Sequence, residues 1–266
     1  MQRKGWSAGA VAAVAALGLA AGSGTAFAAD NGVPAGKAEH AVWDLDVTGT
    51  YTVAGAVPTH QREERWVTAD AGHTVVTDVA SGTMSSEAFQ DATGIFNYNA
   101  GIDTVFSSGP QPEWLSIWSR AVEAQFERYK LNNGRLKKAG LTTFQGKTVL
   151  RLKSPGDVSG DEPGDKVRLD DLVDPDTLAP LRRITDVTTA GGKTLHQVST
   201  QVSFEVVDTA SLPPQALRFG DHPGAKHSGG AASATKNKAK TKAKVKVKKK
   251  TKAKHKAATR KASSRR

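Results

Sequence analysis

The feature that most constrains the fold is an alternation of apolar and polar residues with a period of two. In residues 43–53, WDLDVTGTYTV, aspartates and threonines fill one phase, and the other phase holds Trp43, Leu45, Val47, Tyr51 and Val53. Successive side chains of a β-strand point to opposite faces of the sheet. The segment therefore predicts a strand with one buried face.

Further strand-like segments follow, each bounded by Gly or Asp: ERWVTAD, HTVVTDVA, GIFNYN and IDTVF. LTTFQGKTVLRLK predicts a hairpin that turns at Gln145–Gly146, and residues 166–187 predict two strands around Pro175–Asp176. A last strand in residues 193–208 is expected to place Val198, Val202, Phe204 and Val206 on one face. Strands separated by short turns predict an antiparallel sheet.

One segment breaks the β pattern and predicts a helix. Pro112 suits its first turn and Gly134 its C-terminal stop. Between them an apolar stripe recurs at steps of three and four, formed by Leu115, Trp118, Val122, Phe126 and Tyr129. An antiparallel sheet needs a cover over its apolar face. We therefore expect an α+β domain in residues 39–221, in which one main helix covers an antiparallel sheet.

The N-terminus has the pattern of a secretory signal peptide in residues 1–28. Arg3 and Lys4 precede an apolar, Ala-rich run, and small residues predict cleavage between Ala28 and Ala29. The mature protein is then exported, with residues 29–38 as a flexible lead-in. The chain has no cysteine, so no disulfide forms and no cysteine is present to accept a lipid anchor.

The formal charge of +11 divides sharply along the chain. From Lys226 onwards there are 17 Lys and Arg residues and no acidic residue, whereas residues 29–225 hold 18 basic against all 26 acidic residues, a charge of −8. Residues 222–235 have the composition of a linker, and residues 236–266 predict a disordered, extended polycation. We expect a polyanion to bind Lys236, Lys238, Lys240, Lys242, Lys244, Lys246, Lys248, Lys249, Lys250, Lys252, Lys254, Lys256, Arg260, Lys261, Arg265 and Arg266.

Motifs that would indicate catalysis or a cofactor are missing. The chain has no GxSxG, no HExxH and no GxGxxG after a strand. Its histidines lack the spacing of metal ligands. The acidic loop at Asp157–Asp165 has oxygen ligands suited to calcium, but solvated surface charge is the alternative, because the spacing of the EF-hand loop is absent. We expect a non-enzymatic protein without cofactor or bound metal.

The order of these segments resembles the LolA-like and RseB-like superfamily of lipoprotein carriers and periplasmic sensors. The resemblance covers roughly residues 39–215 and rests on WDLDVTGTYTV, ERWVTADAGHTVVTD, VRLDDLVDPDTLAPLRRITDV and VSFEVVDTASLP. It implies a half-open β-barrel closed by helices over an apolar concave face. Trp43, Leu45, Val47, Tyr51 and Val53 would then line the concavity, and Leu115, Trp118, Val122 and Phe126 would lie on the lid. The tail resembles those of linker histones.

These observations leave several functions open. The first is an exported protein that binds a lipid or acylated ligand and is retained in the cell envelope by its tail on an anionic wall polymer. The alternative makes the tail the functional element, which binds wall polymer, extracellular DNA or glycan, with the domain as scaffold. A third is a tail that folds back onto the acidic domain. The sequence does not indicate an oligomeric state.

Overall fold

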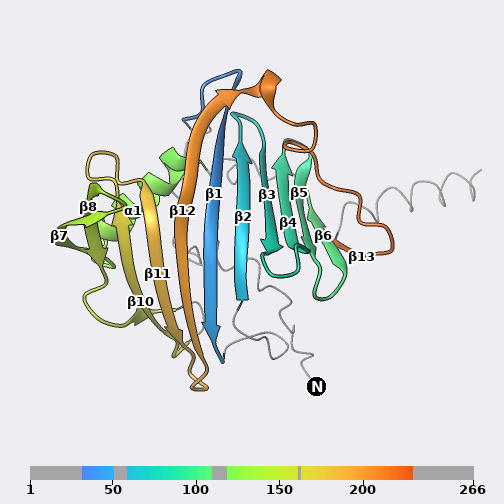
Figure 1. The fold of residues 1–266 in the computed structure, drawn as a ribbon. Helices are drawn as coiled ribbons and strands as arrows, with labels where there is room; N and C mark the ends of the chain where they lie inside the picture. The colour runs from blue at the N-terminus through green and yellow to red at the C-terminus, as the bar shows by residue number, and fades with distance from the viewer. Residues whose placement is uncertain (1–31, 51–58, 110–118, 161–162, 230–266) are drawn as a thin grey trace, which may run out of the picture.

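The computed structural model describes residues 32–50, 59–109, 119–160 and 163–229. Within these ranges, thirteen strands form one open, mostly antiparallel sheet, and one α-helix packs against it (Figure 1). The antiparallel sheet expected from the sequence is confirmed. The helix covers only part of one face, and the described sheet keeps two free ends rather than closing on itself.

The first half of the chain forms a run of consecutive antiparallel strands. They are β1 (Lys37–Gly49), β2 (Thr59–Val67), β3 (Gly72–Asp78), β4 (Met84–Asp91), β5 (Gly94–Asn99) and β6 (Thr104–Ser108). Helix α1 (Arg120–Asn132) leads into a second run. It comprises β7 (Lys137–Phe144), β8 (Lys147–Lys153), β9 (Val158–Ser159), β10 (Lys166–Val173), β11 (Pro180–Thr188) and β12 (Thr194–Asp208).

The two runs meet at the centre of the sheet, where β1 pairs with β12 from Lys37↔Asp208 to Gly49↔Leu195. The chain then passes through a 3₁₀ turn (Thr209–Ser211) and crosses to the far edge. There β13 (Lys226–Gly229) pairs with β6 in parallel. Strand β7 forms the opposite edge.

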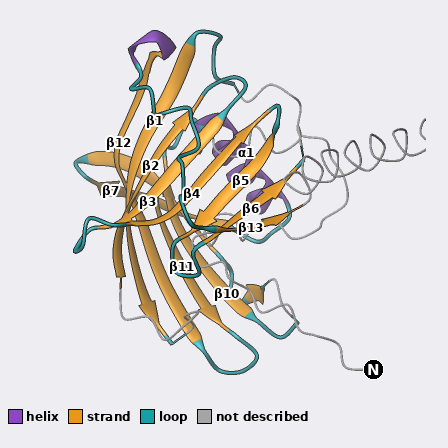
Figure 2. Cartoon of the chain, turned by 90° about the vertical axis from the view of Figure 1, so that its right-hand side faces the viewer, coloured by secondary structure: helices purple, strands orange, loops and turns teal. Residues whose placement is uncertain are grey.

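Adjacent residues on β2 define the two faces of the sheet. The Arg65 guanidinium reaches Glu123 on α1. The next side chain, Trp66, points the other way, because strand side chains alternate. We call these the inner face and the outer face. Figure 2 shows that the sheet is bent and that α1 lies inside the bend.

Two apolar clusters lie on the inner face. One holds Leu136, Leu150, Leu152 and Val173, packed beside the last turn of α1 at Leu131. The other joins the central strands and consists of Ala41, Trp43 and Leu45 with Phe204. Burying such side chains contributes about 1.5–3 kcal/mol each, so the clusters fix both halves of the sheet.

The predicted turns match the structure. Gln145 and Gly146 have φ values of +49° and +75°, the left-handed conformation that a tight type I′ hairpin requires. In the loop between β10 and β11, the Asp174 carboxylate accepts hydrogen bonds from the backbone of Asp176 and Thr177. The strands predicted around Pro175–Asp176 are therefore confirmed as β10 and β11.

The predicted helix differs from the observed one. Helix α1 begins at Arg120, because Ser119 is extended and its Oγ accepts a hydrogen bond from the Val122 N–H at 3.1 Å. Pro112, the predicted first turn, lies outside the described residues, and Tyr129 of the predicted stripe is 48% exposed. The buried face of α1 contains Glu123 and Glu127 instead. Their carboxylates meet cations on the sheet, so apolar periodicity could not reveal this face.

Strand β12 contains a bulge that reverses the expected phase. Val42 pairs with Ser203 and Trp43 with Gln201, which leaves Val202 as an extra residue. Before the bulge, Gln197 and Gln201 are buried on the inner face and Val198 lies on the other face; after it, Phe204 and Val206 share the inner face. The bulged Val202 is 50% exposed, and Val206, near the end of the strand, is 51% exposed. Strand β4, MSSEAFQD, has too little apolar alternation to be predicted and is identified by its pairing with β3 and β5.

The described fold extends beyond the limits that the sequence suggests. Val33 is buried, and β1 already begins at Lys37, within the expected lead-in. At the other end, His222 is held against Glu87, and β13 reaches Gly229. Part of the expected linker in residues 222–235 is thus built into the sheet.

Candidate ligand-binding site

The inner face beneath α1 is occupied by paired charges. The Oε1 atom of Glu123 on α1 accepts hydrogen bonds from Nη1 of Arg65 at 2.9 Å and from Nη1 of Arg183 at 3.1 Å. Arg65 also pairs with Glu63 on its own strand. We call this group, together with Glu127, Lys130 and Asp171, the inner ion cluster.

Local interactions orient the helix over this cluster. The Glu39 carboxylate accepts a hydrogen bond from the Arg120 N–H at 2.6 Å, which places a negative group at the helix N-terminus. The Arg120 side chain donates to Gln201 on β12 at 3.0 Å, and its guanidinium lies 4.4 Å from the centre of the Phe204 ring. The first turn of α1 is thereby tied to the two central strands.

Two carboxylates one turn apart on α1 respond to burial in opposite ways. Burial alone would raise the pKa of Glu123, but Arg65 and Arg183 outweigh it, and the pKa is lowered. The pKa of Glu127 is raised, because burial and the neighbouring Asp171 carboxylate outweigh Lys130 and Arg183. Among the residues that the structure describes, one oxygen of Glu127 and one of Asp171 have no hydrogen-bond partner. Glu123 is thus stabilised as an anion, and Glu127 is not.

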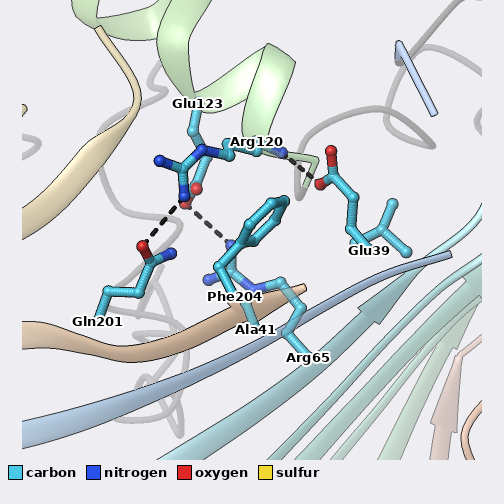
Figure 3. A pocket seen from close by; sticks show the side chains of 8 residues that line it. Glu39, Ala41, Arg65, Arg120, Glu123, Gln201 and Phe204 are labelled. Carbon is cyan, nitrogen blue, oxygen red and sulfur yellow. Dashed lines mark hydrogen bonds and ion pairs between the residues drawn. The ribbon is translucent and has the colours of Figure 1, made fainter. Parts of the chain in front are cut away.

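The space left between α1 and the sheet is small. A cavity of about 10 Å³ lies there. Figure 3 shows Arg65, Arg120, Glu123 and Phe204 among the side chains that line it. Such a volume holds about one water molecule. The lining residues are Glu39, Ala41, Arg65, Val67, Arg120, Glu123, Gln201 and Phe204.

Trp43, Leu45 and Val47 are alternate residues of β1 and share its inner face. Trp43 and Leu45 are buried in the central apolar cluster, and Val47 is half-buried further along the strand. On the helix Val122 is buried and Phe126 is half-buried. Tyr51, Val53, Leu115 and Trp118 lie outside the described residues, as do Ala28, Ala29 and the tail residues from Lys236 to Arg266.

The outer face carries a row of aromatic rings that crosses several strands. His40, Trp66, His73, Phe89 and Phe96 are register neighbours on β1 to β5. Consecutive ring centres along this row lie 5.3 to 6.4 Å apart. Phe219, from the segment after β12, continues the row at 5.7 Å from Phe96. We call this row the outer ladder.

A buried carboxylate fixes that C-terminal segment to the sheet. Glu87 on β4 faces His73 Nε2 at 2.7 Å and His222 Nε2 at 2.6 Å, and it accepts a hydrogen bond from the Gly220 N–H at 2.9 Å. Burial would raise the pKa of Glu87, but these hydrogen bonds outweigh it, and the pKa is lowered. The other ring nitrogen of His73 faces the Ala216 carbonyl oxygen at 3.0 Å.

Both ring nitrogens of His73 therefore face acceptors. A neutral imidazole has one donor and one acceptor, whereas an imidazolium has two donors. These two contacts hold the ring between Glu87 and Ala216, and the ring also stacks on Trp66.

Beside this anchor lies a cavity of about 600 Å³ on the outer side, which we call the outer cavity. Its lining residues are Phe96, Val105, Ser107, Phe219, Gly220, Asp221, His222, Pro223 and His227. The volume falls in the usual range for small-molecule sites, about 300–1,000 Å³. Apolar and aromatic side chains form the walls, and His222 and His227 add polar groups.

This cavity could not be predicted from the sequence, because residues 222–229 have the composition of a linker. The one local signal is Phe219-Gly220-Asp221-His222, in which an aromatic residue and a histidine flank a Gly-Asp pair. Neither residue shows periodicity, and the cavity forms only when the segment folds back across β4, β5 and β6. The contact between Glu87 and His222 joins residues 135 positions apart, which no local pattern reveals.

Two further features of the described residues bear on function. No group of His, Cys, Asp and Glu in the described ranges is arranged to hold a metal ion. In the acidic loop, Asp157 pairs with Arg168 at 2.6 Å, while Asp161 and Glu162 lie outside the described residues. No helix in the described part of the chain is long and apolar enough to cross a membrane.

Comparison with known proteins finds similar solved structures, although no family model and no curated protein matches. An uncharacterized conserved protein from Thermus thermophilus is 12% identical, with 71% of this chain and 90% of that chain covered and a TM-score of 0.39. A chain of the MucA/MucB complex of Pseudomonas aeruginosa is 13% identical, with 70% of this chain and 56% of that chain covered and a TM-score of 0.37. This chain thus spans little more than half of that chain.

A LolA superfamily protein from Nitrosomonas europaea is also similar, with 9% identity, 72% and 94% coverage and a TM-score of 0.32.

Proposed function

We propose that this protein is an exported, non-enzymatic binding protein of the cell envelope that holds a lipid or acylated ligand in the outer cavity. The observation that carries the proposal is the outer cavity itself, about 600 Å³ in volume, with Phe96, Val105, Phe219 and Pro223 in its walls. Burial of an acyl chain against such walls contributes roughly 25 cal/mol per Å².

Polar groups at the same cavity suit an anionic head group. His222 and His227 line it, and the exposed Asp221 is the one acidic residue in its lining. Histidine binds carboxylates and phosphates through hydrogen bonds. The ligand class that fits this combination is an amphiphile with an apolar chain and an acidic head.

The outer cavity is preferred to the inner face that the sequence indicates. Beneath α1, paired charges leave room for about one water molecule. The alternative position for the ligand is formed by the residues that the sequence indicates, namely Trp43, Leu45, Val47, Tyr51, Val53, Leu115, Trp118, Val122 and Phe126. A matched pair of substitutions separates the two.

The test is titration of a fluorescent acyl probe, 11-(dansylamino)undecanoic acid, into the mature full-length protein. Phe219→Leu removes an aromatic wall of the outer cavity, and we expect about tenfold weaker binding, a loss of about 1.4 kcal/mol. Phe204→Leu makes the same change in the apolar cluster of Ala41, Trp43 and Leu45 on the inner face. We expect this variant to bind the probe as the wild type does. The reverse pattern would place the ligand on the inner face, and no binding by the wild type would refute the proposed function.

A second role, retention by the tail, rests on the division of charge between +17 from Lys226 onwards and −8 in residues 29–225. In an extended chain, alternate lysines repeat about every 6–7 Å, which suits a polymer with regularly spaced anions. Replacing the tail lysines by glutamine in the full-length protein should release it from isolated cell-wall material at low salt. Retention that survives this replacement contradicts the role.

A further inference from the structure

The hairpin of β7 and β8 has a charge opposite to that of the rest of the domain. Residues 134–156 contain six basic residues and no acidic one, although residues 29–225 as a whole carry −8. The six are Arg135, Lys137, Lys138, Lys147, Arg151 and Lys153. This concentration of positive charge is separate in sequence from the tail.

Strand geometry places four of these cations on one face of the hairpin. Lys147, Arg151 and Lys153 are separated by even numbers of residues on β8, so their side chains share a face. Lys137 on β7 pairs directly with Lys153, which puts it on the same face. We call these four residues the basic hairpin face. Lys137 and Lys147 are exposed, and the side chains of Arg151 and Lys153 are 42% and 45% exposed.

The charge on this face is not balanced within the described residues. Asp170 on β10 pairs with Arg151 through Nε at 2.8 Å and with Lys153 through Nζ at 3.3 Å. In the described ranges no carboxylate forms an ion pair with Lys137 or Lys147. Four cations therefore share one carboxylate.

Two considerations favour an external anion over a purely structural role. Like charges directly opposite in an antiparallel pair are destabilising, and Lys137 faces Lys153 in this way. Lysines on an edge strand commonly block unwanted sheet pairing, which accounts for those on β7. It does not account for Arg151 and Lys153, because β8 is paired with both β7 and β10 at these residues.

We propose that the basic hairpin face binds a phosphate-bearing chain polymer and is a second contact for it besides the tail. Alternate residues on a strand are about 6.6–6.8 Å apart, so Arg151 and Lys153 lie one such step apart and Lys147 lies two steps from Arg151, with the buried Val149 between them. An extended polyanion along β8 would meet these cations in turn. When a tail and a surface of one chain bind the same polymer, the apparent affinity of the protein for the polymer is higher than that of either element alone. This inference does not depend on the outer cavity. It rests on one part of the proposed function only, the binding of a polyanion by the tail.

The test measures binding of the full-length mature protein to linear inorganic polyphosphate of fixed length over a series of NaCl concentrations. The variant K137Q/K147Q/K153Q removes three cations of the face. The control K37Q/K166Q/K193Q changes the net charge equally at two strand lysines outside the hairpin and one lysine in the turn between β11 and β12. Unfolding midpoints of both variants verify that they are folded.

We expect the slope of log K against log salt to fall by about 2 for the hairpin variant, since each contact to a single-stranded polyanion contributes about 0.7. The control should keep the wild-type slope. A full-length variant with tail lysines replaced by glutamine should retain weak binding that the hairpin substitutions abolish. Equal slopes for hairpin variant and control overturn the inference while leaving the tail's role intact. A wild type that does not bind polyphosphate overturns both.

Discussion

Glu87 and His222 lie 135 positions apart in the sequence, yet Oε2 of Glu87 and Nε2 of His222 are 2.6 Å apart at the edge of the outer cavity. The same carboxylate faces His73 and accepts a hydrogen bond from the backbone of Gly220. This one buried group joins β4, β3 and the C-terminal segment. The wall of the proposed ligand site thus depends on it.

Glu87→Gln should loosen the C-terminal segment. The substitution removes the charge that pairs with His73 and His222, and breaking a buried pair typically costs about 3–5 kcal/mol. We expect faster amide hydrogen exchange in residues 216–229, while β12 keeps its protection. Glu205→Gln, at an exposed carboxylate paired with His40, is the control and should leave exchange unchanged. Unchanged exchange in the Glu87 variant contradicts the anchor.

Acid should release the same segment. The pKa of Glu87 is lowered from its ordinary value of 4.5, so the stability that its ionisation contributes is present above pH 4.5 and is lost as pH falls through the lowered value. We therefore expect protection of residues 216–229 to be constant from pH 7 to 5 and to decline below 4.5. Hydrogen exchange corrected for intrinsic pH effects measures this. A decline that begins near pH 7 would assign the transition to the histidines instead.

Glu123 and Glu127 should respond differently to the same substitution. Glu123 has a lowered pKa and neutralises two arginines, so Glu123→Gln should destabilise the protein by about 3–5 kcal/mol at pH 7. Glu127 has a raised pKa, and the stability that favours its protonated form is lost as pH rises through the raised value. Glutamine mimics that protonated form, so Glu127→Gln should be neutral or stabilising at pH 7. Urea unfolding tests both, and equal losses would refute the assignment.

The apolar cluster beside the last turn of α1 should be sensitive to truncation. Leu152 is fully buried among Leu136, Leu150 and Val173. Leu152→Ala should cost about 2–5 kcal/mol, because it removes apolar contacts and leaves a cavity. Leu141→Ala on the same hairpin is the control, since Leu141 is 67% exposed. Similar unfolding midpoints for the two variants would show that the hairpin is not part of the core.

The sheet could be predicted from sequence wherever alternation and turn chemistry agree. The period of two in WDLDVTGTYTV predicts β1. The residue types of Gln145–Gly146 predict the turn between β7 and β8. The buried face of α1 could not be predicted, because Glu123 and Glu127 read as solvent-facing until Arg65 and Arg183 are placed opposite them. The bulge at Val202 was also not predictable, because the alternation of β12 side chains between the two faces changes phase there, whereas a prediction from sequence takes one phase for the whole strand.

The site was harder to predict than the fold for a related reason. Its walls come from β5, β6 and a segment whose composition resembles a linker, and long-range contacts alone bring them together. The basic hairpin, by contrast, is visible in the sequence as a stretch without acidic residues. Only strand register shows that four of its cations share a face.

The most direct test of the proposed function is to purify the mature protein from its native host, extract it with organic solvent and identify the extract by mass spectrometry. We expect one acyl-bearing, acidic species in a stoichiometric amount, and a markedly lower amount from Phe219→Leu prepared in parallel. An extract without such a species, from a protein that also takes up no offered acyl ligand, would contradict the assignment of the outer cavity as a lipid site.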